Sequence, residues 1–336
     1  MFYCLYKTLN KYIKILLTIL IFVPTISQSQ KVDGIKDQSS YDQVSDYSRN
    51  MRKLLLHDEG KNQLSYLDMS DPSKRWNEPV PSGRDIQLVG KGRVLIGTGL
   101  GYEERDIVTG KKLYELTSYK GTISARRLGN GNTVLVGLNW QEKEGIVLVE
   151  VDEQGVTKRL INYPGFTYVR LIRETVQSTL LVSADNIIFE GDMNGNIIWQ
   201  AKLVGHDHPH AWQPLRLANG QTVVSGGYTG NIQVFDTDGS LIRTIGGPEK
   251  VNPKFYAGLQ ILPTGNLVVI NWQGHGPAMG EKGIQLLEYT PDGELVWSWK
   301  QDATVFSSLQ AVIILDGLDL NLLHVEDENG VLVPQQ

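Results

Sequence analysis

Most of the chain alternates short hydrophobic segments with polar turns. Apolar and β-branched runs such as TVLVG at 133–137 lie between turns that contain glycine. Several turns are Asn-Gly or Asp-Gly pairs, beginning at Asn130, Asn219 and Asp316, and type I′ hairpins favour these pairs because both central residues need positive φ. Long amphipathic helical segments are found nowhere, so the pattern predicts an all-β protein and disfavours a two-domain parallel α/β fold.

A second kind of turn recurs in one frame, directly before the last strand of each predicted unit. Its positions are Pro72, Gly110, Gly155, Gly195, Gly239, Gly293 and Gly330. These turns are spaced by about 43 residues on average, the period of the four-stranded units of β-propellers, whereas β-helices repeat on a shorter period. The residue four positions later is usually large, and we assign Trp76, Trp199 and Trp297 in this frame to packing between units.

The repeat therefore predicts a β-propeller of seven four-stranded blades. Six blades, with residues 50–80 as an accessory hairpin, is the alternative. The first unit lacks an innermost strand and the last lacks an outermost strand. We therefore expect strands from both termini to close the ring, which would remove the open edge of the sheet.

The N-terminal 29 residues have the three parts of a signal peptide. Three lysines precede a nine-residue apolar run at 15–23, and small residues lie before a cleavage site at Gln30. The apolar run is shorter than the ~20 residues that cross a bilayer. Residues 30–49 are polar and predict a flexible lead-in to a propeller domain at 50–336. We expect an exported protein, periplasmic or extracellular, with no membrane span after cleavage.

Composition narrows the possible chemistry. The 336 residues include 35 glycines, as many tight turns require, and one cysteine, Cys4. A single cysteine excludes an internal disulfide, a thiolate zinc site and an iron–sulfur cluster. The net charge of −5 gives no electrostatic footprint for nucleic acid. We expect a monomer whose partner is a small molecule or a carbohydrate.

The first candidate site is a loop rich in histidine. In a propeller, the loops that lead into the innermost strands and those that join the second and third strands meet on one face, around a central funnel. One such loop, GHDHPHAWQ at 205–213, contains His206, His208 and His210. In an extended segment these three side chains project to one side, where they could bind a divalent metal. The alternative is a polar loop whose histidines bond backbone carbonyls.

A second loop, NWQGHGP at 271–277, is expected on the same face. It contributes Asn271, Trp272, Gln273 and His275, and His275 is a candidate fourth imidazole for the metal. The triplet NWQ also occurs at 139–141. A packing rule shared by the repeats is therefore an equally good explanation of the triplet.

Aromatic, amide and cationic residues complete the predicted ligand site. Trp212, Gln213 and Tyr256 could stack on a sugar ring and hydrogen-bond to it. Arg126, or its neighbour Arg127, and Arg170 would suit a carboxylate or a sulfate.

Two segments resemble known propeller families. The D-x-x-G-x-x-x-W pattern of Asp192, Gly195 and Trp199, echoed by Gly293 and Trp297, resembles the repeat of PQQ-like (quinoprotein-type) propellers. Residues 206–222 are similar to a strip of arylsulfotransferase-like propellers, which implies a histidine role in sulfuryl transfer. PQQ itself is disfavoured as a cofactor, because the vicinal cysteine pair of many family members is impossible with one cysteine.

These observations predict an exported propeller that binds a small polar or saccharide ligand in its central funnel, with no catalytic residue assigned. The alternative is an enzyme that uses the histidine cluster, as a metal-assisted lyase or hydrolase or in arylsulfotransferase-like transfer. G-x-S-x-G, Walker and H-E-x-x-H motifs do not occur, which disfavours nucleophile-elbow hydrolysis, P-loop phosphoryl transfer and zincin proteolysis.

Overall fold

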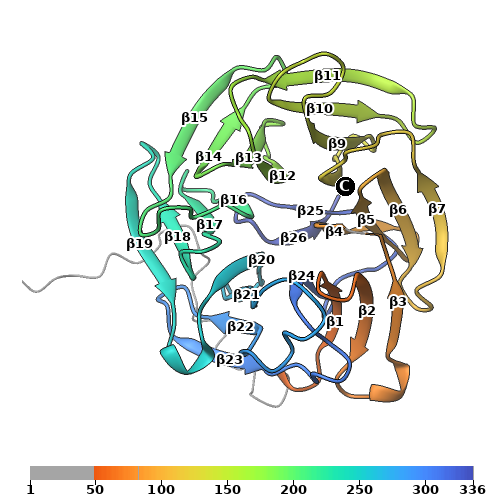
Figure 1. The fold of residues 1–336 in the computed structure, drawn as a ribbon, viewed down its shortest axis with the longest axis vertical. Helices are drawn as coiled ribbons and strands as arrows, with labels where there is room; N and C mark the ends of the chain where they lie inside the picture. The colour runs from red at the N-terminus through yellow and green to blue at the C-terminus, as the bar shows by residue number, and fades with distance from the viewer. Residues whose placement is uncertain (1–48, 82, 336) are drawn as a thin grey trace, which may run out of the picture. The chain divides into compact units, whose positions relative to one another are not determined.

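A computed structural model of the protein describes residues 49–81 and 83–335. They belong to one structural unit, Val32–Gln336. Its strands form six antiparallel sheets of four strands each, which follow one another around a ring (Figure 1). We number these sheets blades 1 to 6. The predicted signal peptide and residues 30–48 of the lead-in lie outside the described residues.

Each blade lists below from its innermost to its outermost strand. Blade 1 is β24 (Leu309–Ile314), β1 (Lys53–Asp58), β2 (Gln63–Asp68) and β3 (Trp76–Pro79). Blade 2 is β4 (Ile86–Gly90), β5 (Arg93–Thr98), β6 (Gly101–Asp106) and β7 (Lys112–Leu116). Blade 3 is β8 (Ser124–Arg127), β9 (Thr133–Leu138), β10 (Ile146–Val151) and β11 (Thr157–Tyr163).

The second half of the ring has the same strand order. Blade 4 is β12 (Val169–Glu174), β13 (Leu180–Ala184), β14 (Ile187–Gly191) and β15 (Ile197–Lys202). Blade 5 is β16 (Pro214–Arg216), β17 (Thr222–Ser225), β18 (Asn231–Phe235) and β19 (Leu241–Gly246). Blade 6 is β20 (Phe255–Ile261), β21 (Leu267–Trp272), β22 (Leu286–Tyr289) and β23 (Leu295–Trp299). Two short 3₁₀ helices, Pro72–Lys74 and Glu249–Val251, lie in connecting loops.

The prediction of seven blades is wrong, and the alternative number of six is right. The seventh turn frame, at Gly330, belongs to a separate two-stranded hairpin, β25 (His324–Glu326) and β26 (Leu332–Pro334). Its turn has the chemistry of the blade turns: Gly330 has φ +71° and its N–H donates to Asp327 O, as Gly195 does to Asp192 O. The extra element therefore lies near the C-terminus, and residues 50–80 form most of blade 1 instead of an accessory hairpin.

Blade 1 combines strands from distant parts of the chain. β24 pairs antiparallel with β1, from Leu54 opposite Ile314 to Asp58 opposite Leu309. The Asp58 carboxylate also accepts the backbone N–H groups of Ser307 (2.5 Å) and Ser308 (3.0 Å). That this pairing is what holds the ring shut stays a prediction.

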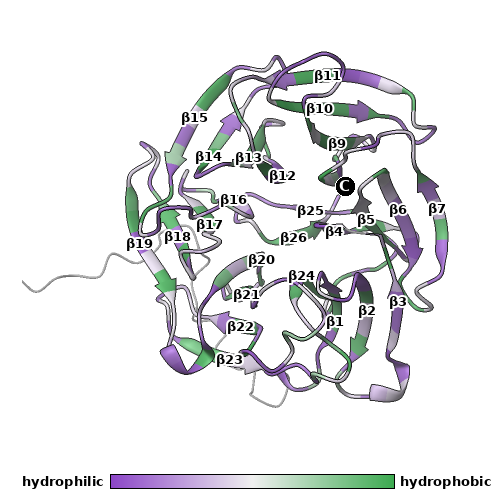
Figure 2. Ribbon diagram, viewed as in Figure 1, coloured by the Kyte–Doolittle hydropathy of each residue, from purple (hydrophilic) through white to green (hydrophobic). Residues whose placement is uncertain are grey.

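The hydrophobic core consists of layers between neighbouring blades. Residues on the two faces of each sheet pack against different neighbours: Leu55 packs with Ile96 of blade 2, whereas Leu54 packs with Ile270 of blade 6. Figure 2 shows hydrophobic residues, in green, in the strands of every blade. Strands covered on both faces are expected to carry such continuous apolar runs.

The hairpin of β25 and β26, which we call the plug hairpin, lies across the middle of the ring in Figure 1. Isolated bridges join its surroundings to the blades, Leu323 to Val89 of blade 2 and Val331 to Ile261 of blade 6. We call the face where the innermost strands begin the upper face, and the face where they end the lower face. Among the described residues, no helix has the length and hydrophobicity to cross a membrane.

Candidate functional site on the upper face

The histidine-rich loop connects β15 to β16 on the upper face, but its three side chains do not form one cluster. His206 and His208 are exposed, and the His208 N–H donates to Nδ1 of His206 at 2.9 Å. His210 has φ +55°, so the segment is not extended there and the expected common direction is lost. Within residues 49–81 and 83–335, no three His, Cys, Asp or Glu side chains form a group that could hold a metal ion.

His210 is held between aromatic rings. Its ring centroid lies 4.5 Å from that of Tyr168 and 5.4 Å from that of Tyr228. Burial, followed by the nearby Arg170 guanidinium, lowers the pKa of His210. The imidazole is therefore expected to be neutral at pH 7.

His275, the predicted fourth ligand, instead pairs with Glu59 of blade 1. Its Nδ1 lies 2.8 Å from Glu59 Oε1, and its side chain is 75% exposed. Glu59 Oε2 accepts a hydrogen bond from the Trp272 indole at 3.2 Å, and the Trp272 and His275 rings are 4.7 Å apart. A carboxylate thus orients this imidazole from the far end of the chain.

The aromatic residues of the upper face form a continuous series from blade 4 to blade 6, which we call the aromatic arc. Consecutive ring centroids lie 4.5 to 5.4 Å apart. Phe255 is central, with edge-to-face contacts to Tyr228, Trp212 and Trp272. The members of the arc are Tyr168, His210, Tyr228, Phe255, Trp212, Trp272 and His275.

Two arginines lie beside this arc. The Arg170 guanidinium is 3.3 Å from the centroid of the Tyr168 ring and 5.5 Å from that of Trp212. Burial, followed by the repulsion of Arg84, lowers the pKa of Arg170. Burial also lowers the pKa of Arg84, against the attraction of Glu59. Among the described residues, neither guanidinium has a carboxylate oxygen within ion-pair distance, so both charges lack direct compensation.

The predicted amide ligands already have partners within the blades. Gln213 donates to Leu259 O and accepts from Leu259 N at 3.0 Å, which joins blade 5 to the innermost strand of blade 6. Asn271 Nδ2 donates to three backbone carbonyls, and Gln273 Nε2 to two. Tyr256 is buried, with its hydroxyl 2.6 Å from that of Tyr289. The repeated NWQ triplet thus includes a structural asparagine, as the packing explanation expected.

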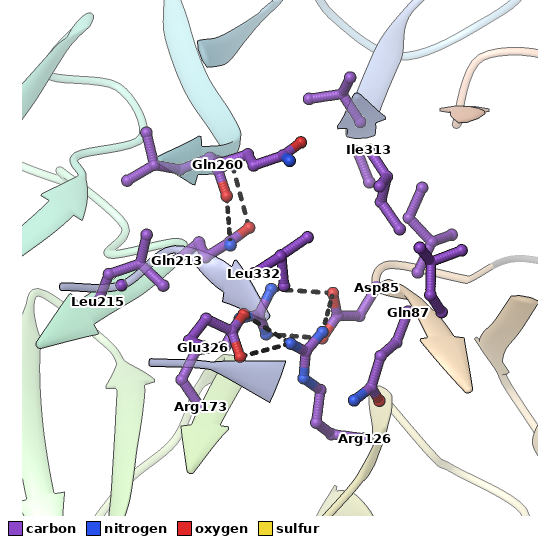
Figure 3. Close-up of a pocket in the computed structure, with 16 residues that line it drawn as sticks. Asp85, Gln87, Arg126, Arg173, Gln213, Leu215, Gln260, Ile313, Glu326 and Leu332 are labelled. Atoms are coloured by element: carbon purple, nitrogen blue, oxygen red, sulfur yellow. Dashed lines mark hydrogen bonds and ion pairs between the residues drawn. The ribbon is translucent and has the colours of Figure 1, made fainter. Parts of the chain in front are cut away.

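Arg126 lies inside the channel, in a cluster of four charges (Figure 3). It contacts both oxygens of Glu326 on the plug hairpin, at 2.5 and 2.7 Å. Arg173 contacts both oxygens of Asp85, at 2.7 and 3.0 Å, and its Nε lies 2.9 Å from Glu326. Burial opposes ionisation of Glu326, but Arg126 and Arg173 prevail and lower its pKa.

The plug hairpin leaves little room for a ligand in the channel. The cavity beside these four charges has a volume of about 20 Å³, close to the space that one water molecule needs. The predicted central funnel is therefore filled by side chains that the repeat pattern assigned to a seventh blade. An open binding surface of this kind is found on the upper face instead.

The sequence reasoning missed three residues of this surface: Glu59, Arg84 and Tyr168. Each obeys the rule that was applied to blades 5 and 6. Glu59 follows the second strand of blade 1, and Arg84 and Tyr168 directly precede innermost strands. Applying the same rule to every blade would have identified them as upper-face residues.

No family model matches this chain, and no curated protein matches it. Solved structures do. A protein of unknown function from Bacteroides caccae has a TM-score of 0.62 and 21% identity, covering 78% of this chain and 97% of its own. The nidogen/laminin complex gives 0.55 and 11%, over 77% and 97%. A streptogramin B lyase gives 0.51 and 13%, over 75% and 80%. These likenesses show the β-propeller fold, and the PQQ-like and arylsulfotransferase-like resemblances stay predictions.

Proposed function

We propose that this protein is an exported propeller that binds an acidic saccharide on its upper face, at the aromatic arc. The observation that carries the proposal is the pair Arg84 and Arg170, two largely buried cations without an ion-paired carboxylate among the described residues. A buried charge is costly unless it is paired. A carboxylate or sulfate group of a ligand would supply the missing partner, and guanidinium groups bind both in bidentate geometry.

The arc itself supports a ligand that carries rings. Aromatic faces beside polar groups pack well against sugar rings. Two donors in this region, Trp212 Nε1 and Arg170 Nε, are buried without a hydrogen-bond partner among the described residues. Such donors are rare in folded proteins, and oxygen atoms of a bound saccharide would satisfy them.

The test compares two oligosaccharides of equal length, one with uronic acid units and one neutral, by isothermal titration calorimetry. We expect the acidic one to bind, and the Arg84→Gln/Arg170→Gln variant to lose about 100-fold in affinity, since hydrogen bonds between charged groups contribute about 1.5–3 kcal/mol each. Arg75→Gln, an exposed arginine of blade 1, is the matched control and should bind like the parent. Equal binding of the neutral oligosaccharide, or normal affinity in the double variant, would refute the proposal.

Export is proposed from the N-terminal sequence alone. The intact mass of the protein from its native host should correspond to a chain that begins at Gln30. A mass that includes Cys4 would exclude cleavage. Sedimentation of the same sample tests the predicted monomer.

A second candidate, an enzyme, is favoured by the pair of His275 and Glu59. A histidine whose other ring nitrogen is held by a carboxylate is a common form of general base, and this one is exposed beside the arc. If the protein turns over its ligand, His275→Ala should abolish turnover and leave binding within a few-fold. A His275→Ala variant with full turnover would remove this candidate.

A further inference from the structure

A recurrent trio of side chains lies between neighbouring blades, away from the proposed ligand site. It consists of an arginine that ends an innermost strand, a glutamate on the third strand of the preceding blade, and an aromatic ring. Between blades 4 and 5, Arg216 is 2.5 Å from Glu190 and 4.4 Å from the Trp199 ring. Between blades 2 and 3, Arg127 is 2.7 Å from Glu104 and 6.0 Å from the centroid of Tyr102.

The trio between blades 2 and 3 carries one additional cation. Arg93, on β5, contacts the second oxygen of the same carboxylate, Glu104, at 3.1 Å. Two guanidiniums therefore share one carboxylate, which leaves one positive charge in excess. In the trio between blades 4 and 5, the ion pairs found among the described residues join Glu190 to Arg216 alone.

These groups line a cavity of about 280 Å³ between blades 2 and 3. Tyr102 is buried at its inner side, and the ring of Tyr114 on β7 lies 5.7 Å from it and is half-buried. Lys91 and Glu153 also line the cavity, and both are exposed residues of opposite charge. The size is just below that of common small-molecule pockets, so a molecule with a single ring is the appropriate ligand.

We propose that this cavity is a binding site for a small monocarboxylate that carries one ring. Arg93 uses Nη1 for Glu104, and Arg127 uses Nε for Thr133 and Nη2 for Glu104. Because a guanidinium has five N–H donors, both retain donors for a second carboxylate. That carboxylate compensates the excess charge, and the ring of the ligand packs against Tyr114.

The proposal goes beyond the upper-face function and uses none of its residues. Two kinds of molecule share the required chemistry, a uronic acid monosaccharide and an aromatic acid. The experiment therefore uses D-glucuronate and 4-hydroxybenzoate as separate probes, with neutral D-glucose as the third. All titrations are made in the Arg84→Gln/Arg170→Gln background, so that binding at the upper face does not contribute.

We expect at least one of the two acids to bind by calorimetry and glucose to show no heat. Adding Arg93→Gln should weaken binding about tenfold or more, because a charged hydrogen-bond donor is lost. Adding Tyr114→Ala should weaken it as well. Trp199→Ala, which removes the aromatic residue at the same frame position in blade 4, is the matched control and should bind like the background protein.

Arg93 is partly exposed, and Arg127 still pairs with Glu104 without it, so the Arg93→Gln variant should keep the parent's circular dichroism spectrum and melting temperature. A folded Arg93→Gln variant with undiminished affinity would overturn the proposal. So would glucose binding as tightly as the acids, or no binding by either acid.

Discussion

Two pairs of arginines lie near the axis of this propeller, and they differ in what surrounds them. Arg126 and Arg173, inside the channel, meet two carboxylates, Asp85 and Glu326. On the upper face, Arg170 lies over an aromatic ring and is repelled by Arg84. The first pair is neutralised by the protein itself, and the second is left for another molecule to neutralise.

The difference teaches how to separate stability from binding in a fold built of repeats. A cluster of two cations and two anions is complete, so removing one member leaves a buried charge without a partner. An incomplete cluster has already accepted that cost, which is typical of functional sites. Substitutions in the two pairs should therefore act on different properties of the protein.

The largest effect is expected from Glu326→Gln. The change leaves Arg126 and Arg173 with Asp85 as their one carboxylate in the cluster, and breaking such a buried arrangement typically destabilises a protein by about 3–5 kcal/mol. Urea unfolding followed by circular dichroism measures the loss. A midpoint equal to that of the parent would show that the plug hairpin contributes no stability through this cluster, and the comparison would fail.

A smaller effect is expected from acid, through His57. This residue is fully buried on β1, and both ring nitrogens lack a hydrogen-bond partner among the described residues. Burial, followed by the charge of Arg84, lowers its pKa from 6.5 to about 4. Between these two values the unfolded chain binds more protons than the folded one, so stability falls as the pH falls from about 6.5 to about 4, by about 3 kcal/mol.

The check is the difference in unfolding free energy between the parent and His57→Leu at several pH values. Above pH 6.5 this difference should be constant. Below it, the variant should gain relative to the parent with each step toward pH 4. A difference that is independent of pH would mean that His57 does not titrate on unfolding.

The smallest effect is expected from Arg84→Gln/Arg170→Gln on stability. Removing two uncompensated cations should leave the unfolding free energy unchanged or raise it by about 1 kcal/mol, as substitutions that relieve a functional site often do. Thermal melting at low ionic strength, where repulsion between charges is strongest, measures this change. A drop of several kcal/mol would assign these arginines to the fold, as for the channel pair.

The sequence contains the repeated unit in a readable form, because Asp-x-x-Gly turns and short apolar strands are local features. The number of blades was harder to obtain. Gly330 has the same turn as Gly195, but three-residue strands flank it and no third or fourth strand follows. Turn chemistry does not report how many strands a unit possesses.

The candidate site was predictable by position and not by partner. His210, Trp212 and Arg170 were placed on the correct face by their relation to the innermost strands. Arg126 precedes Arg170 by one blade and looked equivalent, but its partner Glu326 is 200 residues away in the chain. Glu59 and His275, 216 residues apart, pair across the junction of blades 6 and 1. Contacts of this range depend on how the ring is assembled, which a single sequence does not state.

The pairing of β24 with β1 has a consequence for how the protein folds. The two strands are separated by about 250 residues, so β1, β2 and β3 remain a three-stranded sheet until the chain of five further blades has been organised. Contacts between residues so distant in sequence form slowly, because the entropy of a large loop is lost before the contact is gained. Assembly of blade 1 should therefore be the late step of folding, and β1 should expose an unpaired edge until it occurs.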